Sequence, residues 1–474
     1  MIGREEEIQT LREALEKPEA QFIAVYGRRR VGKTYLVRET FAGKFAFYHT
    51  GVANVGMGEQ LLNFRDSLVK YGYAGCPMLK NWREAFLALE HVIESSNDAR
   101  KVIFIDELPW LDTRQSQFVP ALEHFWNGWA SARKDVVLIV CGSATSWMIS
   151  KVIKDHGGLH NRVTERIHLL PFTLRECEQY ANAAGLDFSR EDICRTYMAL
   201  GGIPFYWDLL KRGKSVNQNM DALFFSENGK LRGEFNELFC SLFKESKLHR
   251  SMVEILARRG IGMTREDVLK GLKISDGGKI TKCLEELEQC GFVRSYTAFG
   301  KKKRDTLFQL IDNLALFHLR FVAGESNPDE NFWSNTSLSS AQAAWRGLAF
   351  ERVCLQHLRQ IKRGLQIGGV VTHVCSWRHV PDEVHTQGAQ IDLLIDRADG
   401  VIDVCEMKYC SDKYAPDKRS DEEMRRRLAV FEAVAAPRKA IRAVLVTPFG
   451  IERNAYSSRF SNILTFDDLF APKA

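Results

Sequence analysis

The sequence predicts an α/β protein in which a parallel sheet comes first, a small helical segment with a hairpin follows, and a second α/β domain comes last. Three observations lead to this prediction. Apolar runs alternate with helical stretches over residues 1–235, helix caps and a hairpin pattern occur within residues 240–325, and two adjacent strand-like runs with internal carboxylates lie within residues 340–474. A length of 474 residues is in keeping with about three domains.

Composition narrows the class of protein. Hydrophobic residues make up 45% of the chain and charged residues 27%, as in an ordinary globular protein. The net charge of +6 permits nucleic acid as a partner without requiring it. The 11 cysteines are scattered and form no CxxC pair, which fits reduced thiols and gives no zinc-binding signature. Because no run approaches about 18 apolar residues and no signal peptide is recognisable, we expect a cytoplasmic protein outside the membrane.

Residues 27–34, GRRRVGKT, connect an apolar run to a helix-forming stretch. This strand–turn–helix context is what a phosphate-binding P-loop requires. Glycines at positions 27 and 32 allow a tight turn and a close approach of backbone N–H groups to phosphate oxygens. The lysine is predicted to reach the β- and γ-phosphates and the threonine to bind Mg²⁺. We expect the nucleotide to be contacted by Gly27, Arg28, Arg29, Arg30, Val31, Gly32, Lys33 and Thr34.

Four further strand-like runs follow: KFAFYHT, KVIFIDEL, VVLIVCGS and RIHLLPF. Continuously apolar strands that alternate with helices favour a parallel sheet covered on both faces. One run ends in Asp106, predicted to hold Mg²⁺, and Glu107, predicted to polarise the attacking water. The next ends near Ser143, which is predicted either to orient that water and sense hydrolysis or simply to cap a helix.

The segments GRRRVGKT, FIDELPWL, CGSATSWM and GGIPFYW together resemble prokaryotic AAA-type P-loop ATPases near the STAND-like branch. The opening Ile2-Gly3-Arg4-Glu5 is similar to the adenine-side segment of that family. The resemblance covers residues 1–235 and implies a five-stranded core in which the sensor strand separates the Walker A and Walker B strands. It also implies a small helical lid that follows the core and contains Gly201, Gly202 and Pro204.

The same resemblance implies an arginine finger just before the fifth strand, where the sequence reads HNRVTERIHL. Arg162 is preferred over Arg166, and an ordinary solvated arginine is the alternative for either. A finger that acts in trans would require a homo-oligomer. The guanine-recognition motif NKxD is absent, so the expected cofactors are ATP and Mg²⁺.

The middle segment has the outline of a winged helix-turn-helix. A helix is predicted over residues 249–259, a capping box at residues 264–267 begins a second, and Ser275 is expected to cap a third over residues 276–289. The runs FVRSYTAF and TLFQLID then form a hairpin. Its tip, with Lys301, Lys302, Lys303 and Arg304, is predicted to contact DNA phosphates.

The third helix of this segment also carries acids, Glu285, Glu286 and Glu288, which would repel phosphate unless they face away. A rigid spacer or a protein contact is therefore the alternative role for the segment.

The last part of the chain follows a polar linker, residues 324–340, and opens with a helix over residues 341–361 that carries Glu351. After a basic loop come two strands, residues 389–395 with Asp392 and residues 400–408 with Glu406 and Lys408. The last two are at i, i+2 and share one face. Because carboxylates among apolar neighbours are costly to bury without a cation, we predict that Asp392 and Glu406 bind Mg²⁺ for phosphodiester hydrolysis. Lys408 would stabilise the developing charge or help to deprotonate water, and Glu351 would add a carboxylate.

These residues resemble the PD-(D/E)xK nuclease superfamily, in the form of the domain attached to such archaeal and bacterial ATPases. The matching positions are Asp392, the triplet Glu406-Met407-Lys408, and Glu351 in GLAFERV, with Ile391 in place of the proline. A helix over residues 418–434 and a strand over residues 441–447 complete the expected αβββαβ order. The resemblance implies a restriction-endonuclease-like fold, in which some members bind without cutting.

We therefore expect ATP-dependent action on DNA, with nucleotide state gating a Mg²⁺-dependent nuclease-like or DNA-binding domain at residues 340–474. Two alternatives remain open. One is a STAND-like signalling switch whose last domain binds a partner without cleavage, and the other is a transcription regulator that uses the winged helix.

Overall fold

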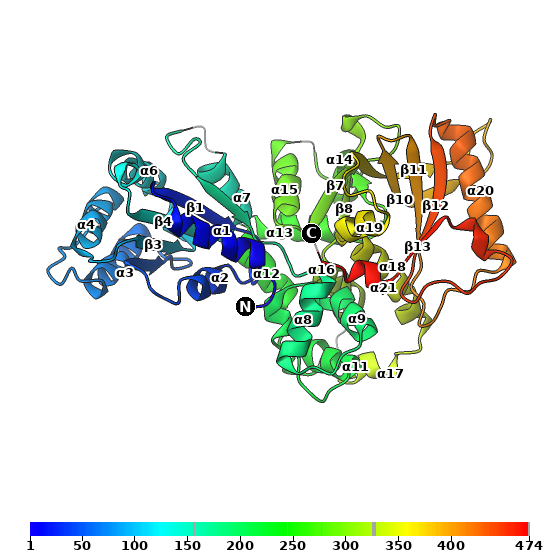
Figure 1. Cartoon of the computed structure of the whole chain (residues 1–474), viewed down its shortest axis with the longest axis horizontal. Helices are drawn as coiled ribbons and strands as arrows, with labels where there is room; N and C mark the ends of the chain where they lie inside the picture. The colour runs from blue at the N-terminus through cyan, green and yellow to red at the C-terminus, as the bar shows by residue number, and fades with distance from the viewer. Residues whose placement is uncertain (155–156, 244, 276, 325–328, 473–474) are drawn as a thin grey trace. The chain divides into compact units, whose positions relative to one another are not determined.

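The computed structural model describes the chain except residues 155–156, 244, 276, 325–328 and 473–474 (Figure 1). By internal contacts the chain divides into two compact units, Met1–Pro171 and Phe172–Ala474. The domain limits predicted between residues 235 and 240 and between residues 325 and 340 both lie inside the second unit. In the described parts of the chain, no helix combines the length and the apolar character needed to cross a bilayer.

The first unit is built on a five-stranded sheet in which every pairing is parallel, as the sequence predicted. The strand order is β2-β3-β4-β1-β5, so β4 separates β1 from β3. The strands are β1 Gln21–Tyr26, β2 Phe47–Thr50, β3 Lys101–Asp106, β4 Val136–Gly142 and β5 Glu165–His168. The helices are α1 Glu5–Glu16, α2 Lys33–Thr40, α3 Met57–Lys70, α4 Trp82–Ser95, α5 Leu108–Leu111, α6 Phe118–Gly128 and α7 Thr145–Met148, with short turns η1 Ala130–Ala132 and η2 Ile149–Ile153.

Helices cover the sheet because its central strands are apolar on both faces. All residues of β3 and of β4 are buried. One sheet face, with Phe47 and Leu138, packs in a single core with Trp82 of α4 and Phe125 of α6. Because both faces of these strands are buried, apolar side chains are favoured at every position, and the sequence of each strand is a continuous apolar run.

The second unit begins with a group of helices: α8 Leu174–Ala184, α9 Arg190–Leu200, α10 Pro204–Trp207, α11 Val216–Met220, η3 Asp221–Phe225 and α12 Glu234–Leu242. Capping boxes at Thr173 and Ser189 begin α8 and α9. Between α9 and α10, Gly202 accepts a hydrogen bond from Phe172 N (2.6 Å). A Cβ at Gly202 would overlap the backbone of Phe172, so this close approach requires glycine.

The middle segment contains three helices and a three-stranded antiparallel sheet of order β6-β8-β7. The predicted capping box begins α14, where Thr264 and Asp267 bond reciprocally. The predicted cap at Ser275 is wrong, because α15 begins at Gly278 and its N-cap is the extended Gly277. The elements are α13 Ser246–Leu256, β6 Met263–Thr264, α14 Arg265–Leu272, α15 Gly278–Gln289, β7 Val293–Thr297, η4 Lys303–Asp305 and β8 Thr306–Leu310.

The predicted polar linker is partly wrong. Within it, residues 325–328 lie outside the described chain, but Phe332–Asn335 forms the short helix α17 and Trp333 is buried. The backbone N–H groups of Trp333 and Ser334 donate to the buried Asp221 carboxylate (2.8 and 3.2 Å), which fixes this turn. Before it lie α16 Asn313–Phe317 and η5 His318–Val322.

The last segment has a mixed sheet of order β13-β12-β11-β10-β9. β9, β10 and β11 pair antiparallel, whereas β11, β12 and β13 pair parallel. The segment predicted as a basic loop contains β9, so that part of the prediction is wrong. The elements are α18 Ser340–Gln356, α19 Leu358–Gly364, β9 Thr372–His379, β10 Ala389–Arg397, β11 Val401–Met407, α20 Lys418–Ala435, β12 Ala440–Val446, η6 Ser457–Arg459, β13 Asn462–Leu464 and α21 Phe466–Leu469.

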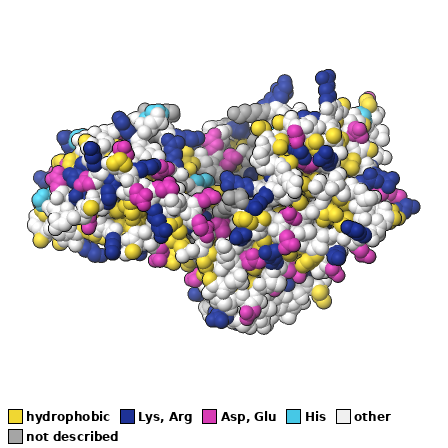
Figure 2. Space-filling model, viewed as in Figure 1, with side chains coloured by type: hydrophobic (Ala, Val, Ile, Leu, Met, Phe, Trp, Pro, Cys, Tyr) yellow, Lys and Arg dark blue, Asp and Glu magenta, His cyan; other side chains and the backbone are white. Residues whose placement is uncertain are grey.

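Contacts join the three segments of the second unit. Phe299 N, just after β7, donates to Ser376 O of β9 (2.8 Å), and Leu174 N of α8 donates to His357 Nε2 (2.9 Å). Phe299 also packs edge-on against Phe431 of α20 (5.3 Å between ring centroids). On the face seen in Figure 2, basic and acidic side chains are interspersed.

Candidate functional site

The loop between β1 and α2 has the backbone that its glycines predicted. Gly27 and Gly32 have φ values of 146° and 91°, and a Cβ at Gly27 would overlap the carbonyl of Leu169. Lys33 is buried at the start of α2 and its Nζ donates to the carbonyls of Gly27 (3.0 Å) and Arg28 (2.9 Å). The ammonium group therefore lies inside the loop, in the position from which a P-loop lysine meets phosphate.

The rest of the loop is tightly held. Arg28 and Val31 are buried, whereas Arg29 and Arg30 are half-buried. The opening segment lies against the loop, because Arg4 Nη2 donates to the carbonyls of Val31 (3.4 Å) and Leu170 (2.8 Å). The segment expected on the adenine side is therefore a neighbour of the P-loop.

The ends of β3 and β4 meet the P-loop through hydrogen bonds. Thr34 Oγ1 donates to Asp106 Oδ2 (2.7 Å), and Glu107 N donates to Asp106 Oδ1 (2.9 Å). Ser143 donates to Glu107 Oε2 from both its backbone N (3.2 Å) and its Oγ (2.9 Å). The structure thus brings Lys33, Thr34, Asp106, Glu107 and Ser143 together at the C-terminal ends of β1, β3 and β4.

Two features of this group of residues bear on chemistry. Asp106 is buried beside a hydroxyl, and a carboxylate with a hydroxyl is a donor pair that Mg²⁺ prefers. Glu107 has a left-handed backbone (φ 47°), a conformation that costs a non-glycine residue free energy and recurs at active sites. Arg162 and Arg166, the candidate finger residues, are both exposed near β5.

The second predicted site also assembles. The β10–β11 ladder ends with Leu393 opposite Cys405, the residues next to Asp392 and Glu406, and the charges of both acids act on Glu351. β10 is irregular between Ile391 and Leu394, at the position of Asp392. Lys408 Nζ lies 2.9 Å from Glu406 Oε1, as expected for side chains on one strand face.

Arg427 of α20 was missed by the sequence reasoning. Its Nη1 donates to Glu406 Oε2 (2.8 Å) and its Nη2 to Glu406 Oε1 (3.0 Å), a bidentate pair. A signal existed, because Met424, Arg427, Leu428 and Phe431 follow the i, i+3, i+4, i+7 spacing of the apolar helix face. An arginine on such a face needs a buried partner.

The pKa of Glu351, on α18, is affected by the other acids of the site. Burial raises its pKa, the charges of Asp392 and Glu406 raise it further, and those of Arg352 and Lys408 oppose the rise, so that the pKa reaches about 7. Burial also acts on Glu406, but the bonds and charges of Arg427 and Lys408 outweigh it and lower the pKa of Glu406. The site therefore contains one acid with a raised pKa, Glu351, and one with a lowered pKa, Glu406.

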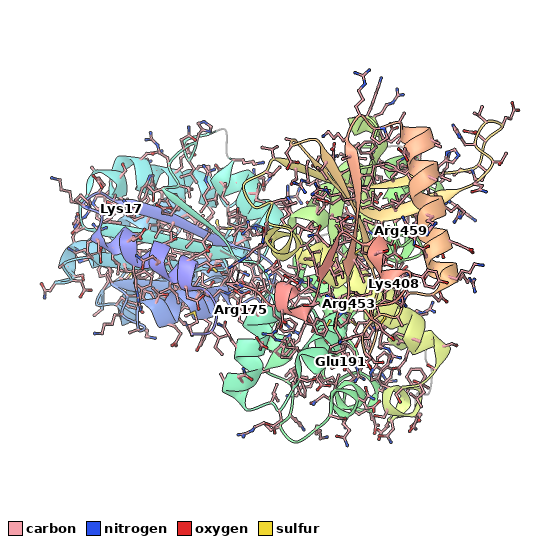
Figure 3. All side chains as sticks on the ribbon, turned by 45° about the vertical axis from the view of Figure 1, so that its right-hand side comes forward. Lys17, Arg175, Glu191, Lys408, Arg453 and Arg459 are labelled. Atoms are coloured by element: carbon pink, nitrogen blue, oxygen red, sulfur yellow. The ribbon has the colours of Figure 1, made fainter. Side chains whose placement is uncertain are left out.

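Basic side chains from the middle segment also face this site. Burial lowers the pKa of Arg294, on β7, to about 10 even though the charge of Asp392 raises it. The Arg294 guanidinium lies over the ring of Tyr296 (4.5 Å). At the end of β11, Tyr409 donates to Glu191 of α9 (3.0 Å), which anchors the strand next to Lys408; Glu191 and Lys408 are labelled in Figure 3.

The basic hairpin and α15 present cations to solvent. Lys301, Lys302 and Arg304 are exposed, whereas the side chain of Lys303 lies outside the described chain. Two of the acids on α15 that would repel phosphate are bound to other side chains and backbone groups of the protein. Glu286 contacts His249 (2.9 Å), and Glu288 accepts from Ser295 N (3.0 Å).

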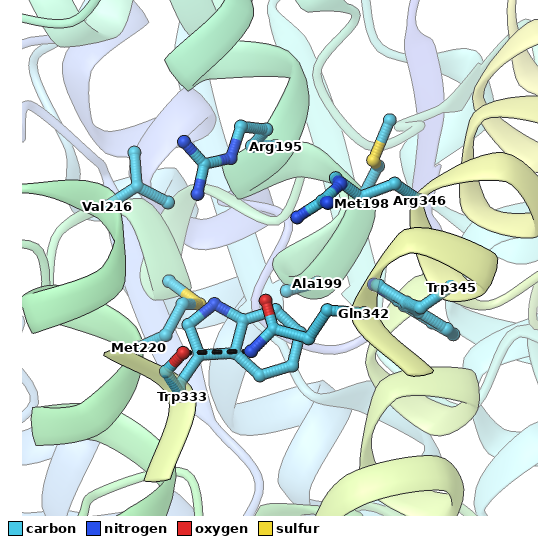
Figure 4. A pocket seen from close by; sticks show the side chains of 9 residues that line it. All are labelled: Arg195, Met198, Ala199, Val216, Met220, Trp333, Gln342, Trp345 and Arg346. Atoms are coloured by element: carbon cyan, nitrogen blue, oxygen red, sulfur yellow. Dashed lines mark hydrogen bonds between the residues drawn. The ribbon is translucent and has the colours of Figure 1, made fainter. Parts of the chain in front are cut away.

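A small pocket in the second unit lies apart from these sites (Figure 4). It is lined by Arg195, Met198, Ala199, Val216, Met220, Trp333, Gln342, Trp345 and Arg346. Gln342 Nε2 donates to Trp333 O across it (2.8 Å), and Arg195 Nη2 donates to Asn217 Oδ1 (2.7 Å). The first bond joins α18 to α17 and the second joins α9 to α11.

Comparison with known proteins agrees with the P-loop geometry. Residues 1–210 match the family model of an ATPase domain predominantly from Archaea. An uncharacterised protein of Methanocaldococcus jannaschii is 23% identical over 396 residues, which are 83% of each chain.

Two solved structures show similarity at lower levels. A Walker-type ATPase of Pyrococcus abyssi is 18% identical, with 68% of this chain and 96% of that chain covered and a TM-score of 0.48. A STAND protein with a tetratricopeptide repeat sensor from Pyrococcus horikoshii is 17% identical, with 77% and 50% covered and a TM-score of 0.33.

Proposed function

We propose that the chain binds ATP with Mg²⁺ at the C-terminal ends of β1, β3 and β4 and hydrolyses it there. The observation that carries this proposal is the 2.7 Å bond from Thr34 Oγ1 to Asp106 Oδ2 beside the buried Lys33 ammonium. Thr34 and Asp106 are the groups that would hold Mg²⁺, which when bound neutralises charge on the phosphates. Lys33 exchanges its bonds to loop carbonyls for bonds to phosphate oxygens.

Glu107 is the proposed base that orients the attacking water. Ser143 restrains its carboxylate through two donors, which keeps Glu107 Oε2 at the strand edge until the γ-phosphate competes for Ser143. The hydrogen bonds from Ser143 to Glu107 would then depend on whether the γ-phosphate is present. Arg162, exposed before β5, is the proposed finger, and its action on a neighbouring copy requires a homo-oligomer.

The second site is proposed to act on a DNA phosphodiester. Asp392 and Glu406 would hold Mg²⁺, which supplies Lewis-acid stabilisation of the phosphate when bound. Burial is the main cause of the raised pKa of Glu351, and the charges of Asp392 and Glu406 add to it, so three carboxylates lie close enough to interact where a cation could bind. Glu351 would take the proton of the attacking water, and Lys408 would stabilise charge on the phosphate.

The middle segment is proposed to be a winged helix that brings DNA to this site. Its hairpin presents Lys301, Lys302 and Arg304 to solvent, and its α15 presents Lys279 and Lys282. Cations exposed in this way bind phosphates and release counterions, so binding should weaken steeply with salt.

A second function is favoured by the pair of Arg427 and Glu406. A bidentate guanidinium already satisfies the carboxylate that should bind Mg²⁺. A site held in this form binds a partner without cutting it, as in a STAND-like switch or a transcription regulator driven by ATP. In the nuclease, by contrast, Mg²⁺ and the substrate must displace Arg427 from Glu406.

The test is cleavage of supercoiled plasmid and of single-stranded DNA by the full chain with Mg²⁺, with and without ATP. We expect Glu406→Ala/Lys408→Ala to abolish cleavage while ATP hydrolysis persists, and Lys33→Ala to abolish both if nucleotide gates the nuclease. Glu422→Ala is the matched control, since Glu422 is exposed on α20 and its ion-pair partner among the described residues is Lys418, 3.8 Å away. Hydrolysis of ATP without any cleavage would reject the nuclease and favour the switch.

A further inference from the structure

Three potential metal ligands converge in the middle segment, apart from both sites described above. His249 lies on α13, whereas Cys283 and Glu286 lie on α15 at i, i+3 and therefore on one helix face. One ligand atom from each of the three side chains lies within 4.8 Å of the other two. His249 and Cys283 are buried, with 1% and 4% of their surface exposed, and the Glu286 side chain is 21% exposed.

The imidazole is already oriented as a ligand. His249 Nδ1 lies 2.9 Å from the carbonyl of Glu245, to which it donates, and the ring stacks on Phe243 (4.0 Å between centroids). These two contacts direct Nε2 toward Glu286 Oε2, 2.9 Å away. Donation from the second ring nitrogen to a carbonyl is how metal-binding histidines are usually held.

The surroundings of Nε2 favour a positive charge. Burial lowers the pKa of His249, but hydrogen bonds to Cys283, to Glu286 and to the Glu245 carbonyl outweigh burial and raise the pKa to about 9. The three side chains offer ligand atoms within 4.8 Å of one another, where a divalent cation would meet all three. Lys282 is exposed and approaches the other Glu286 oxygen, Oε1, at 4.0 Å, so Oε2 remains directed at the cluster.

The donor set identifies the class of metal. Thiolate, imidazole and carboxylate together suit Zn²⁺ better than Mg²⁺, which prefers oxygen ligands. A tetrahedral Zn²⁺ with bonds of about 2.0–2.3 Å keeps its ligand atoms roughly 3.5 Å apart. His249 Nε2 and Glu286 Oε2 are 2.9 Å apart and the ligand atoms of all three side chains lie within 4.8 Å of one another, so rotamer-scale adjustments are enough to form the site.

We propose that His249, Cys283 and Glu286 bind one Zn²⁺ ion and that the fourth position is left to water. Binding releases the proton of His249 Nε2 and that of the Cys283 thiol, and forms bonds from the metal to Nε2, Sγ and a carboxylate oxygen. The ion joins α13 to α15, and α15 carries the exposed Lys279 and Lys282. The metal would therefore fix the helix that presents these cations.

The test is titration of the reduced, chelator-treated full chain with Co²⁺, followed by displacement with Zn²⁺. All variants carry Cys240→Ser, because Cys240 is exposed and lies 3.9 Å from Ser246 at the start of α13. We expect a thiolate-to-Co²⁺ charge-transfer band that saturates at one ion per chain. Cys283→Ser should abolish the band, and His249→Gln should weaken binding by more than about 100-fold.

Cys290→Ser is the matched control, since Cys290 is buried at the end of the same helix and lies outside the cluster. It should retain the band. Zn²⁺ should also raise the melting temperature of the parent and of Cys290→Ser, but not that of Cys283→Ser. A far-ultraviolet circular dichroism spectrum and a metal-free melting temperature equal to those of the parent show that each variant has folded. The proposal is overturned if the parent shows no saturable band, or if the band survives in Cys283→Ser.

Discussion

Replacement of Arg427 by Met removes the only bidentate partner that the described chain gives to Glu406. The two side chains are 15% and 12% exposed, and they are joined by bonds of 2.8 and 3.0 Å. Methionine keeps most of the aliphatic volume of arginine on α20, so packing against β10 should survive. What is lost is the charge that offsets the cost of burying the Glu406 carboxylate.

The size of the effect depends on how far Lys408 still compensates the charge of Glu406. Removing one partner of a buried ion pair costs about 3–5 kcal/mol. Lys408 still lies 2.9 Å from Glu406, but its side chain is 44% exposed and water screens it, so it offsets only part of this cost. We therefore expect a loss of about 2–3 kcal/mol in the local opening free energy of α20 and β11, which corresponds to a roughly 30–150-fold larger equilibrium constant for opening.

Native-state hydrogen exchange of the full chain measures this opening, because amides of α20 and β11 report the local equilibrium. Arg425→Met is the control, since Arg425 is 63% exposed on the same helix and its buried partner Asp421 keeps the ion pair with Arg459 (2.9 Å), so the loss should cost about 1 kcal/mol or less. In a double-mutant cycle with Glu406→Gln the two effects should be strongly non-additive. Equal exchange in Arg427→Met and Arg425→Met, or additivity in the cycle, would refute the reasoning.

Three further results are expected. Glu107→Gln should retain ATP binding but lower hydrolysis by about 10²–10⁴-fold, measured as phosphate release beside nucleotide fluorescence. Gly202→Ala should lower the free energy of unfolding by about 3 kcal/mol in urea titrations because its Cβ meets the Phe172 backbone, whereas Gly56→Ala, in open space, should not. Burial lowers the pKa of His49 to about 4. The contribution of neutral His49 to stability is therefore complete above pH 6.5 and is lost as the pH falls toward 4. Across that window the wild type should lose roughly 3 kcal/mol more of its free energy of unfolding than His49→Gln, measured in the same urea titrations.

The sequence predicted the first sheet well because its strands are buried on both faces. β3 and β4 have no exposed residue, and such strands read as apolar runs with sharp ends. β9 was hidden for the opposite reason. It is an edge strand, only Cys375, Ser376 and Trp377 in it are buried, and its two histidines and an arginine read as a basic loop.

Local rules also failed where a distant contact decided the structure. The stretch around Trp333 has the composition of a linker, yet the buried Asp221 carboxylate holds its backbone N–H groups. Asp221 is far away in the sequence, so no window around Trp333 contains this signal. Ser275 failed for a nearer reason, since the glycines at positions 277 and 278 let the chain stay extended and delay the helix.

The acids of the second site were predictable, whereas their cations were not, and the reason is physical. A carboxylate inside an apolar strand can be recognised from its neighbours, but the charge that compensates it comes from whichever element folds over it. Here Arg427 comes from α20, and Arg294, which interacts with Asp392, comes from β7 of another predicted domain. The bidentate guanidinium takes one lone pair on each oxygen of Glu406, and its positive charge repels a divalent cation, so the two groups compete for this carboxylate. Under the proposed function, the choice between a nuclease and a binding module would depend on whether Arg427 or Mg²⁺ is bound to Glu406, and the apolar spacing of α20 already marked the position of Arg427 as inward.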